Sequence, residues 1–183
     1  MIIGSVSENR DLEKRISITP DIVKKYINLG FDIILSKNYG KHLGFEDKEY
    51  SEYGVKFASD DKTLIENSNI IIQMSLLDTS KTSLLKSNQT YIGVLNPFEN
   101  KNELDELVKK KVNLFSLELL PRITRAQSMD ILSSQANLAG YKAVVESFST
   151  FEKAIPMMMT AAGTIPAAKV LVIGAGVAGL QAI

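Results

Sequence analysis

Six residues near the end of the sequence have the types and spacing of a phosphate-binding turn. The run Gly174-Ala175-Gly176-Val177-Ala178-Gly179 follows the apolar residues 169–173 and precedes residues 180–183, which begin a helix. With this G-x-G-x-x-G spacing, the first glycine permits a tight turn, the second admits a pyrophosphate and the third allows close strand–helix packing. Free N–H groups at the start of the helix favour phosphate. The pattern predicts dinucleotide binding by Gly174, Ala175, Gly176, Val177 and Gly179. The alternative is a tight turn without a ligand.

A second group of candidate residues lies in the polar segment 121–135. Arg122 and Arg125 supply guanidinium forks that suit carboxylate or phosphate. Gln127 can both donate to and accept from a carboxamide, and Asp130 can orient an arginine or a ribose hydroxyl. If the segment is helical from Ser128, Asp130 and Ser133 lie one turn apart. Composition supports equally well a helix-capping loop that begins at Ser128.

The composition excludes several other kinds of chemistry. The 183 residues contain 21 Lys and Arg against 21 Asp and Glu, so the net charge is zero and nothing predicts a nucleic-acid partner. There are no cysteines, which excludes disulfides, thiolate metal sites and a cysteine nucleophile. The single histidine, His42, lies in a glycine-rich loop, and we predict no metal site.

Apolar runs and amphipathic segments alternate along the first two thirds of the chain. We expect strands at 2–6, 31–35, 55–57, 69–74, 90–95 and 112–117. Between them we expect helices at 19–30, 46–53, 63–66 and 103–111. Because parallel strands need a crossover, this alternation predicts an α/β fold: an open, mostly parallel sheet flanked by helices.

The last third predicts a long connecting helix and the start of a second domain. A helix at 134–153 has apolar residues at three- and four-residue steps, and a loop at 160–168 leads to a strand at 169–173. We therefore expect an α/β domain at 1–133, a connecting helix and loop at 134–168, and a truncated nucleotide-binding domain at 169–183. The ribose-binding acid expected about 20 residues after the turn is then outside the sequence. Nothing predicts a signal peptide or a membrane span.

The segment 121–141 together with residues 169–183 closely resembles the NAD(H)-binding first domain of proton-translocating NAD(P) transhydrogenase, from its alpha subunit. The resemblance extends to Glu8-Asn9-Arg10 and to Arg15-Ile16-Ser17-Ile18-Thr19-Pro20. It implies a Rossmann or flavodoxin-like fold, NAD as cofactor, and hydride transfer between NADH and NADP coupled to proton translocation. It also implies partners: an NADP-binding domain, a membrane proton-channel domain and a second copy in a homodimer. The location implied is cytoplasmic, peripheral at the inner face of the membrane, with activity only alongside the missing segments.

The resemblance also implies roles for particular residues. The family's loop beside the nicotinamide uses an Arg, a Gln, an Asp and a Ser, which fall here on Arg122, Gln127, Asp130 and Ser133, with Ile123 and Thr124 between them. Hydride transfer between two nicotinamides needs aligned rings and little water, and no acid or base. We expect Gln127 and Asp130 to orient the ring and Arg122 to hold the loop and the cofactor, as the catalytic set.

Two alternatives remain open. Alanine dehydrogenase has similar N-terminal and glycine-turn features, but that family uses a Lys for the substrate carboxylate and a His for proton transfer. Here Gln73 and Asn96 lie in those regions, whereas Arg15 matches the family's Arg. The other alternative is a non-catalytic nucleotide-binding or assembly module.

Overall fold

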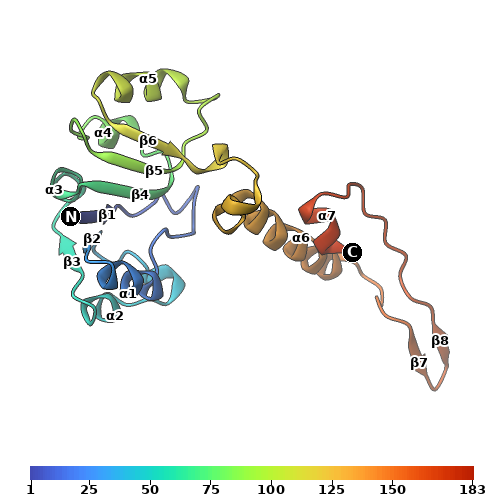
Figure 1. Cartoon of the computed structure of the whole chain (residues 1–183). Helices are drawn as coiled ribbons and strands as arrows, with labels where there is room; N and C mark the ends of the chain where they lie inside the picture. The colour runs from blue at the N-terminus through green and yellow to red at the C-terminus, as the bar shows by residue number, and fades with distance from the viewer. The chain divides into compact units, whose positions relative to one another are not determined.

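The computed structural model describes all 183 residues, which form two compact units, Met1–Leu120 and Pro121–Ile183. We call these unit 1 and unit 2 and describe each by itself (Figure 1). The polar segment 121–133 falls in unit 2. The predicted domain boundaries at 133 and 168 stay predictions.

Unit 1 contains a six-stranded sheet in the order β3-β2-β1-β4-β5-β6. Every neighbouring pair of strands is parallel. This is the usual order of doubly wound sheets, and it confirms the predicted open α/β class. The strands are β1 Ile2–Ser5, β2 Asp32–Ser36, β3 Lys56–Ala58, β4 Ile70–Ser75, β5 Thr90–Val94 and β6 Asn113–Ser116.

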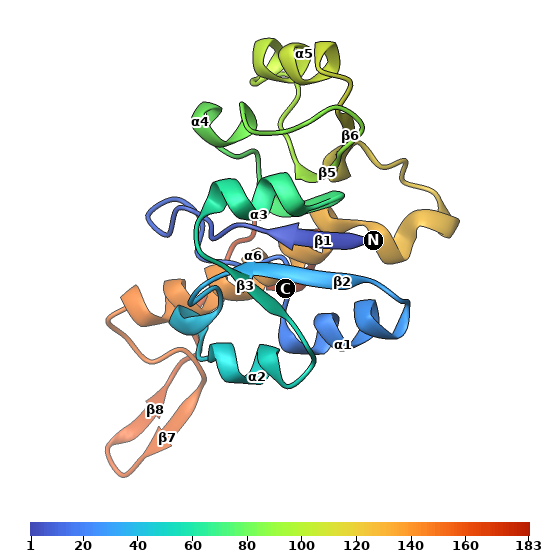
Figure 2. The same cartoon turned by 90° about the vertical axis from the view of Figure 1, so that its left-hand side faces the viewer.

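Helices cover both faces of this sheet, with α1 and α2 on one side and α3, α4 and α5 on the other (Figure 2). Their bounds are α1 Pro20–Asn28, α2 Asp47–Ser51, α3 Asp61–Asn67, α4 Thr79–Thr82 and α5 Lys101–Lys109. Pro20 begins α1, where its missing N–H costs nothing. Helix α4 is not predicted from the sequence, because a single turn has no apolar periodicity, although the Asp78 side chain caps it by accepting from the Lys81 N–H.

The core of unit 1 lies on the two faces of the sheet. Ile71 belongs to one buried cluster with Leu64 and Leu107, whereas Ile70 and Ile72 pack against the other cluster, which contains Val23. Successive residues of a strand point to opposite faces, so the run of three isoleucines in β4 serves both clusters. This explains why the strand is continuously apolar: both of its faces are covered.

Unit 2 consists of a 3₁₀ helix at Thr124–Met129, the long helix α6 at Ile131–Thr150, a hairpin and the short helix α7 at Val177–Ala182. The hairpin pairs β7, Met158–Thr160, with β8, Gly163–Ile165, in antiparallel register, inside a stretch expected to be a loop. Helix α6 begins and ends three residues earlier than predicted. No helix of the protein combines the length and apolar composition that a membrane span requires.

The predicted strand at 169–173 is wrong for this structure. These residues have no regular secondary structure, and their backbone makes no hydrogen bond to another backbone group. A strand exists only when a neighbouring strand pairs with it, and the two strands of unit 2, β7 and β8, pair with each other. Val170, Leu171 and Ile173 are exposed as a result.

Candidate functional site

The glycine turn has the backbone conformation of a sharp connection into a helix. Gly174 has a φ of +112°, a region that side-chain-bearing residues rarely adopt. Gly176 is the N-cap of α7, and its carbonyl accepts from the Leu180 N–H at 2.9 Å. A Cβ added to Gly179 would lie 2.1 Å from the Gly174 carbonyl oxygen. The first glycine therefore allows the turn, and the third lets helix and turn touch.

Gly176 is different, because neither its backbone conformation nor its packing requires a glycine there. Its φ of −76° and ψ of −174° suit any residue. A Cβ built on it would meet no atom within 4 Å. The space beside this backbone is therefore open, which fits a site where a phosphate group approaches the chain.

The polar segment forms the N-terminal cap of α6. One carboxylate oxygen of Asp130 accepts from the Ser133 N–H at 2.9 Å, and the other accepts from the Ser133 hydroxyl at 2.7 Å. These two hydrogen bonds, helped by the positive charge of Arg122, lower the pKa of Asp130 below its ordinary value of 3.8. Asp130 is therefore a carboxylate at neutral pH. The capping alternative had the right role but the wrong residue, since Asp130 and not Ser128 is the cap.

The other side chains of the segment point to solvent. Arg122, Ile123, Thr124 and Gln127 are exposed, whereas Ala126 between them is buried. Neither the Arg122 guanidinium nor the Gln127 carboxamide makes a hydrogen bond within the chain, so both retain their full capacity for a ligand. The structure thus brings Asp130, Ser133 and Arg122 together and leaves Gln127 exposed beside them.

Both candidate groups lie in unit 2, and two helices join them. The polar segment leads into α6, and the glycine turn leads into α7. Gly140 is the one buried residue of α6, and a Cβ there would lie 2.2 Å from the Ala178 carbonyl oxygen of α7. Sequence reasoning missed this residue. A glycine in the middle of a 20-residue helix, where it costs about 1 kcal/mol relative to alanine, was the signal that would have revealed it.

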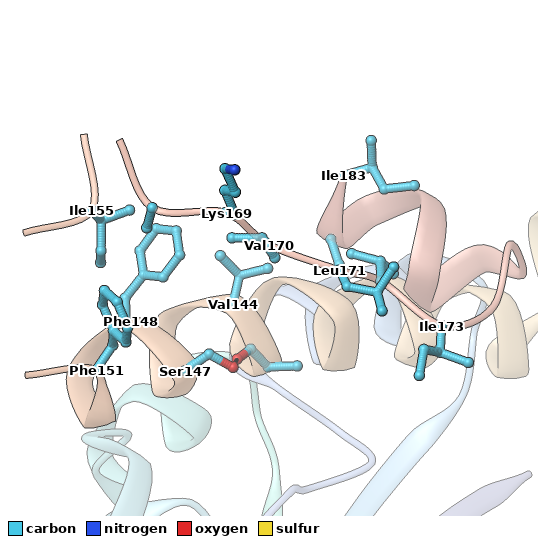
Figure 3. A pocket seen from close by; sticks show the side chains of 14 residues that line it. Val144, Ser147, Phe148, Phe151, Ile155, Lys169, Val170, Leu171, Ile173 and Ile183 are labelled. Atoms are coloured by element: carbon cyan, nitrogen blue, oxygen red, sulfur yellow. Dashed lines mark hydrogen bonds between the residues drawn. The ribbon is translucent and has the colours of Figure 1, made fainter. Parts of the chain in front are cut away.

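A separate apolar groove of about 730 Å³ lies between α6, α7 and residues 168–173 (Figure 3). Val144 and Phe148 of α6, Leu171 and Ile183 contribute to its walls. Lys169 is its only charged residue. A surface of this composition suits packing against apolar protein, and it offers no arrangement of groups for catalysis.

In unit 1 the sheet order reverses between β1 and β4, the place where open α/β sheets usually bind ligands. Buried Gln73 fills this place. Its Oε1 accepts from the Val6 N–H at 2.7 Å and the Ser5 hydroxyl at 2.9 Å. Its Nε2 donates to the Val6 carbonyl at 3.0 Å and to Glu8 Oε1 at 3.1 Å. Every hydrogen-bonding position of the amide is therefore used inside the protein.

The neighbouring polar groups of unit 1 are also engaged. Glu8 accepts from the Met74 N–H at 2.7 Å and the Ser75 hydroxyl at 2.8 Å. Arg15 Nε donates to Glu13 at 2.8 Å, and the Asn96 N–H donates to Glu118 at 2.5 Å. His42 is exposed and contacts the Lys14 carbonyl at 2.7 Å. Neither Gln73 nor Asn96 can exchange a proton near neutral pH.

Comparison with known proteins gives the family. The family model described as "Alanine dehydrogenase/PNT, N-terminal domain" matches residues 4–139, and the model of the corresponding C-terminal domain matches residues 143–183. An NAD(P) transhydrogenase alpha subunit of Rhodospirillum rubrum is 41% identical over 188 residues, covering 100% of this chain and 49% of that protein. An alanine dehydrogenase of Methanococcus maripaludis is 24% identical over 185 residues, covering 100% and 49%.

A solved structure agrees with this match. The transhydrogenase from Sinorhizobium meliloti superposes with a TM-score of 0.93 at 39% identity, covering 100% of this chain and 52% of that one. The chain spans about half the length of the Rhodospirillum rubrum subunit and of the Sinorhizobium meliloti chain. The matched residues contain both the polar segment and the glycine turn. The chain is thus a member of the alanine dehydrogenase/PNT family, with high similarity to transhydrogenase alpha subunits.

Proposed function

We propose that this chain forms the NAD(H)-binding part of a proton-translocating transhydrogenase. The observation that carries the proposal is Gly176, a glycine that neither backbone conformation nor packing requires. A pyrophosphate at this position explains the residue, because a side chain would occupy the space that the phosphate needs. A purely structural turn explains Gly174 and Gly179 but not Gly176.

The glycine turn and the polar segment bind different parts of the dinucleotide. The turn, through Gly174, Ala175, Gly176, Val177 and Gly179, holds the pyrophosphate by backbone N–H groups. Gln127 and Asp130 orient the nicotinamide ring, and Arg122 holds the loop and the cofactor, while Ile123, Thr124 and Ser133 complete the loop. When bound, NADH supplies the hydride itself. The protein aligns the ring and keeps water away from it.

The side chains present suit this positioning role. Asp130 stays ionised because its pKa is lowered, so it accepts hydrogen bonds over the whole neutral range. Gln127 has no titrating group, and Arg122 supplies a guanidinium with five N–H donors. Hydride transfer between two nicotinamides requires no proton transfer by the protein, so the absence of an acid or base near neutral pH in this loop is consistent with the reaction.

The test uses a chimera in which this chain replaces the matching part of the Rhodospirillum rubrum subunit, assayed with its partner subunits. Gly176→Ala should weaken NADH binding by about tenfold or more, because the added Cβ displaces at least one phosphate hydrogen bond. Gln127→Asn should slow hydride transfer by up to about 100-fold, the cost of a 1 Å misplacement, while NADH affinity stays nearly constant. Unchanged binding in Gly176→Ala and unchanged turnover in Gln127→Asn would refute the proposal.

Deamination of alanine is the second candidate, and the residues at the switch point of unit 1 argue against it. That reaction requires a group that gains and loses a proton, and a cation for the substrate carboxylate. Gln73 is neutral, buried and fully hydrogen-bonded, and Asn96 carries no proton to exchange. Alanine-dependent formation of NADH by the chimera would favour this alternative, whereas transfer from NADPH to an NAD analogue favours transhydrogenation.

The partners belong to the same proposal. An NADP-binding domain must present the second nicotinamide, and a membrane domain must conduct the protons. A homodimer and a location at the inner face of the membrane follow from the resemblance. We expect the 183 residues by themselves to bind NADH weakly or not at all, because residues 169–173 lack the neighbouring strands that would hold the turn. Submicromolar binding in a calorimetric titration would contradict this.

A further inference from the structure

The contact between α6 and α7 is closest at Gly140. A Cβ on this residue would lie 2.2 Å from the oxygen, 2.9 Å from the carbonyl carbon and 3.0 Å from the Cα of Ala178. All three are backbone atoms, so no change of rotamer can relieve the overlap. Any side chain at residue 140 must therefore push the two helices apart.

This contact lies between the two halves of the candidate site. Asp130, the cap of α6, is ten residues before Gly140, about 15 Å along the helix axis. Ala178 follows Gly176 by two residues, so the glycine turn is fixed to α6 at this point. The polar segment begins one helix, the turn begins the other, and the crossing at Gly140 sets the separation between them.

We propose that Gly140 is a positioning residue for the dinucleotide: it fixes the distance between the segment that orients the nicotinamide and the turn that holds the pyrophosphate. This inference rests on the proposed function. The nicotinamide and the pyrophosphate belong to one ligand and are separated by one ribose, so the protein groups that bind them must keep a matching separation. A glycine at the crossing point provides the closest approach that two helices can make.

Gly140→Ala should misplace one half of the site relative to the other. The Cβ needs roughly 1 Å more room than the 2.2 Å available, so α7 and its turn must move by about that amount. A shift of 1 Å is enough to lower the rate of a positioned reaction by about 100-fold. Because Ala178 belongs to both the turn and α7, the two move together, and the turn keeps its own conformation.

Binding of two ligands, NADH and ADP-ribose, distinguishes a positioning role of Gly140 from a general role in stability. ADP-ribose carries the pyrophosphate and both riboses but lacks the nicotinamide. In the chimera described above, Gly140→Ala should leave the affinity for ADP-ribose within about twofold while it lowers the affinity for NADH by about tenfold, as the nicotinamide contacts are lost. Fluorescence titration of NADH and calorimetry with ADP-ribose give the two dissociation constants.

Control variants make each outcome decisive. Lys142→Ala, on the exposed side of the same helix, should change neither constant, and Gly176→Ala should weaken both ligands together. Equal loss of NADH and ADP-ribose in Gly140→Ala, or no loss of either, would overturn the positioning role. An unaltered chimera that binds neither ligand would instead refute the proposed function. Amide hydrogen exchange in α7 supplies an independent measurement, and it should rise in Gly140→Ala but not in Lys142→Ala.

Discussion

At the scale of single residues, the structure requires glycine at two of the three glycine positions of the turn. Gly174 adopts a positive φ, and Gly179 has no room for a Cβ, whereas Gly176 has both an ordinary conformation and open space. The motif alone cannot distinguish these situations. The structure therefore assigns Gly174 and Gly179 to folding and gives no such reason for Gly176.

Alanine substitutions should separate these reasons without any ligand present. Gly179→Ala should destabilise the packing of α7, because its Cβ would overlap the Gly174 carbonyl. Gly176→Ala should cost α7 no more than the modest difference between glycine and alanine as N-cap residues, because its Cβ meets no atom within 4 Å. Amide hydrogen exchange of residues 177–182 measures both effects. Exchange as fast in Gly176→Ala as in Gly179→Ala would show that the packing of α7 itself needs this glycine.

Gln73 is the residue on which unit 1 depends most for its buried polar contacts. Gln73→Leu keeps the size of the side chain but leaves the Val6 N–H and carbonyl without partners and removes one donor to Glu8. Each buried group left without a partner costs about 1–3 kcal/mol. We expect the free energy of unfolding to fall by about 3 kcal/mol in urea titrations followed by circular dichroism.

The matched control is Gln127→Leu, the same replacement at an exposed position, which should change the free energy of unfolding by less than about 0.5 kcal/mol. If Gln73→Leu were equally harmless, the hydrogen bonds at the switch point would contribute little to the free energy of unfolding of unit 1.

At the scale of elements, the start of α6 depends on a side chain that titrates. The folded-state pKa of Asp130 is lowered by its hydrogen bonds to Ser133. Its contribution to helix stability is therefore fully present above the ordinary pKa of 3.8 and is lost as the pH falls through the lowered value. Between neutral pH and about pH 5 the cap should not change.

The corresponding experiment measures amide exchange at Ser133 and Ser134 as a function of pH, corrected for intrinsic exchange. Protection should fall below about pH 4 in the natural sequence. In Asp130→Asn, which keeps a capping oxygen without a charge, protection should be nearly independent of pH in this range. Loss of protection at the same pH in both proteins would assign the effect to another group.

At the scale of the whole molecule, unit 1 has everything that an independently folding domain needs. All members of the two buried clusters lie before residue 120, and the six strands pair only with one another. Residues 1–120 should therefore unfold in one cooperative urea transition, as domains of this size usually do. A non-cooperative transition with binding of a hydrophobic dye would show that unit 2 stabilises the first sheet.

The elements of unit 1 were predictable from the sequence, because the patterns that indicate them lie within short stretches of the chain. Alternating apolar and amphipathic segments placed all six strands and four of the five helices of the sheet unit within a few residues. Each of those segments meets its partner inside the same unit, so local preference and tertiary packing agree. The single-turn helix α4 was not predicted, because its only signal in the sequence is the capping residue Asp78.

The two motifs of the candidate site were visible in the sequence, whereas the crossing of the helices α6 and α7 was not. The glycine spacing and the polar segment are visible in the sequence because each is contiguous. The crossing of α6 and α7 joins residues 140 and 178, and no local pattern relates positions so far apart. The N-cap of α6 was not predictable either. It is Asp130 and not Ser128, because the Asp130 side chain accepts from the Ser133 N–H at the start of the helix.

The sequence by itself therefore determined most elements of unit 1, the α/β class and the types of side chain and turn that suit a dinucleotide. Tertiary structure decided the strand order, the burial and hydrogen bonding of Gln73, and the failure of residues 169–173 to form a strand. The physical reason is the same in each case. Propensity and spacing act between neighbours along the chain, whereas strand pairing, burial and helix crossing depend on which distant segments come within contact distance.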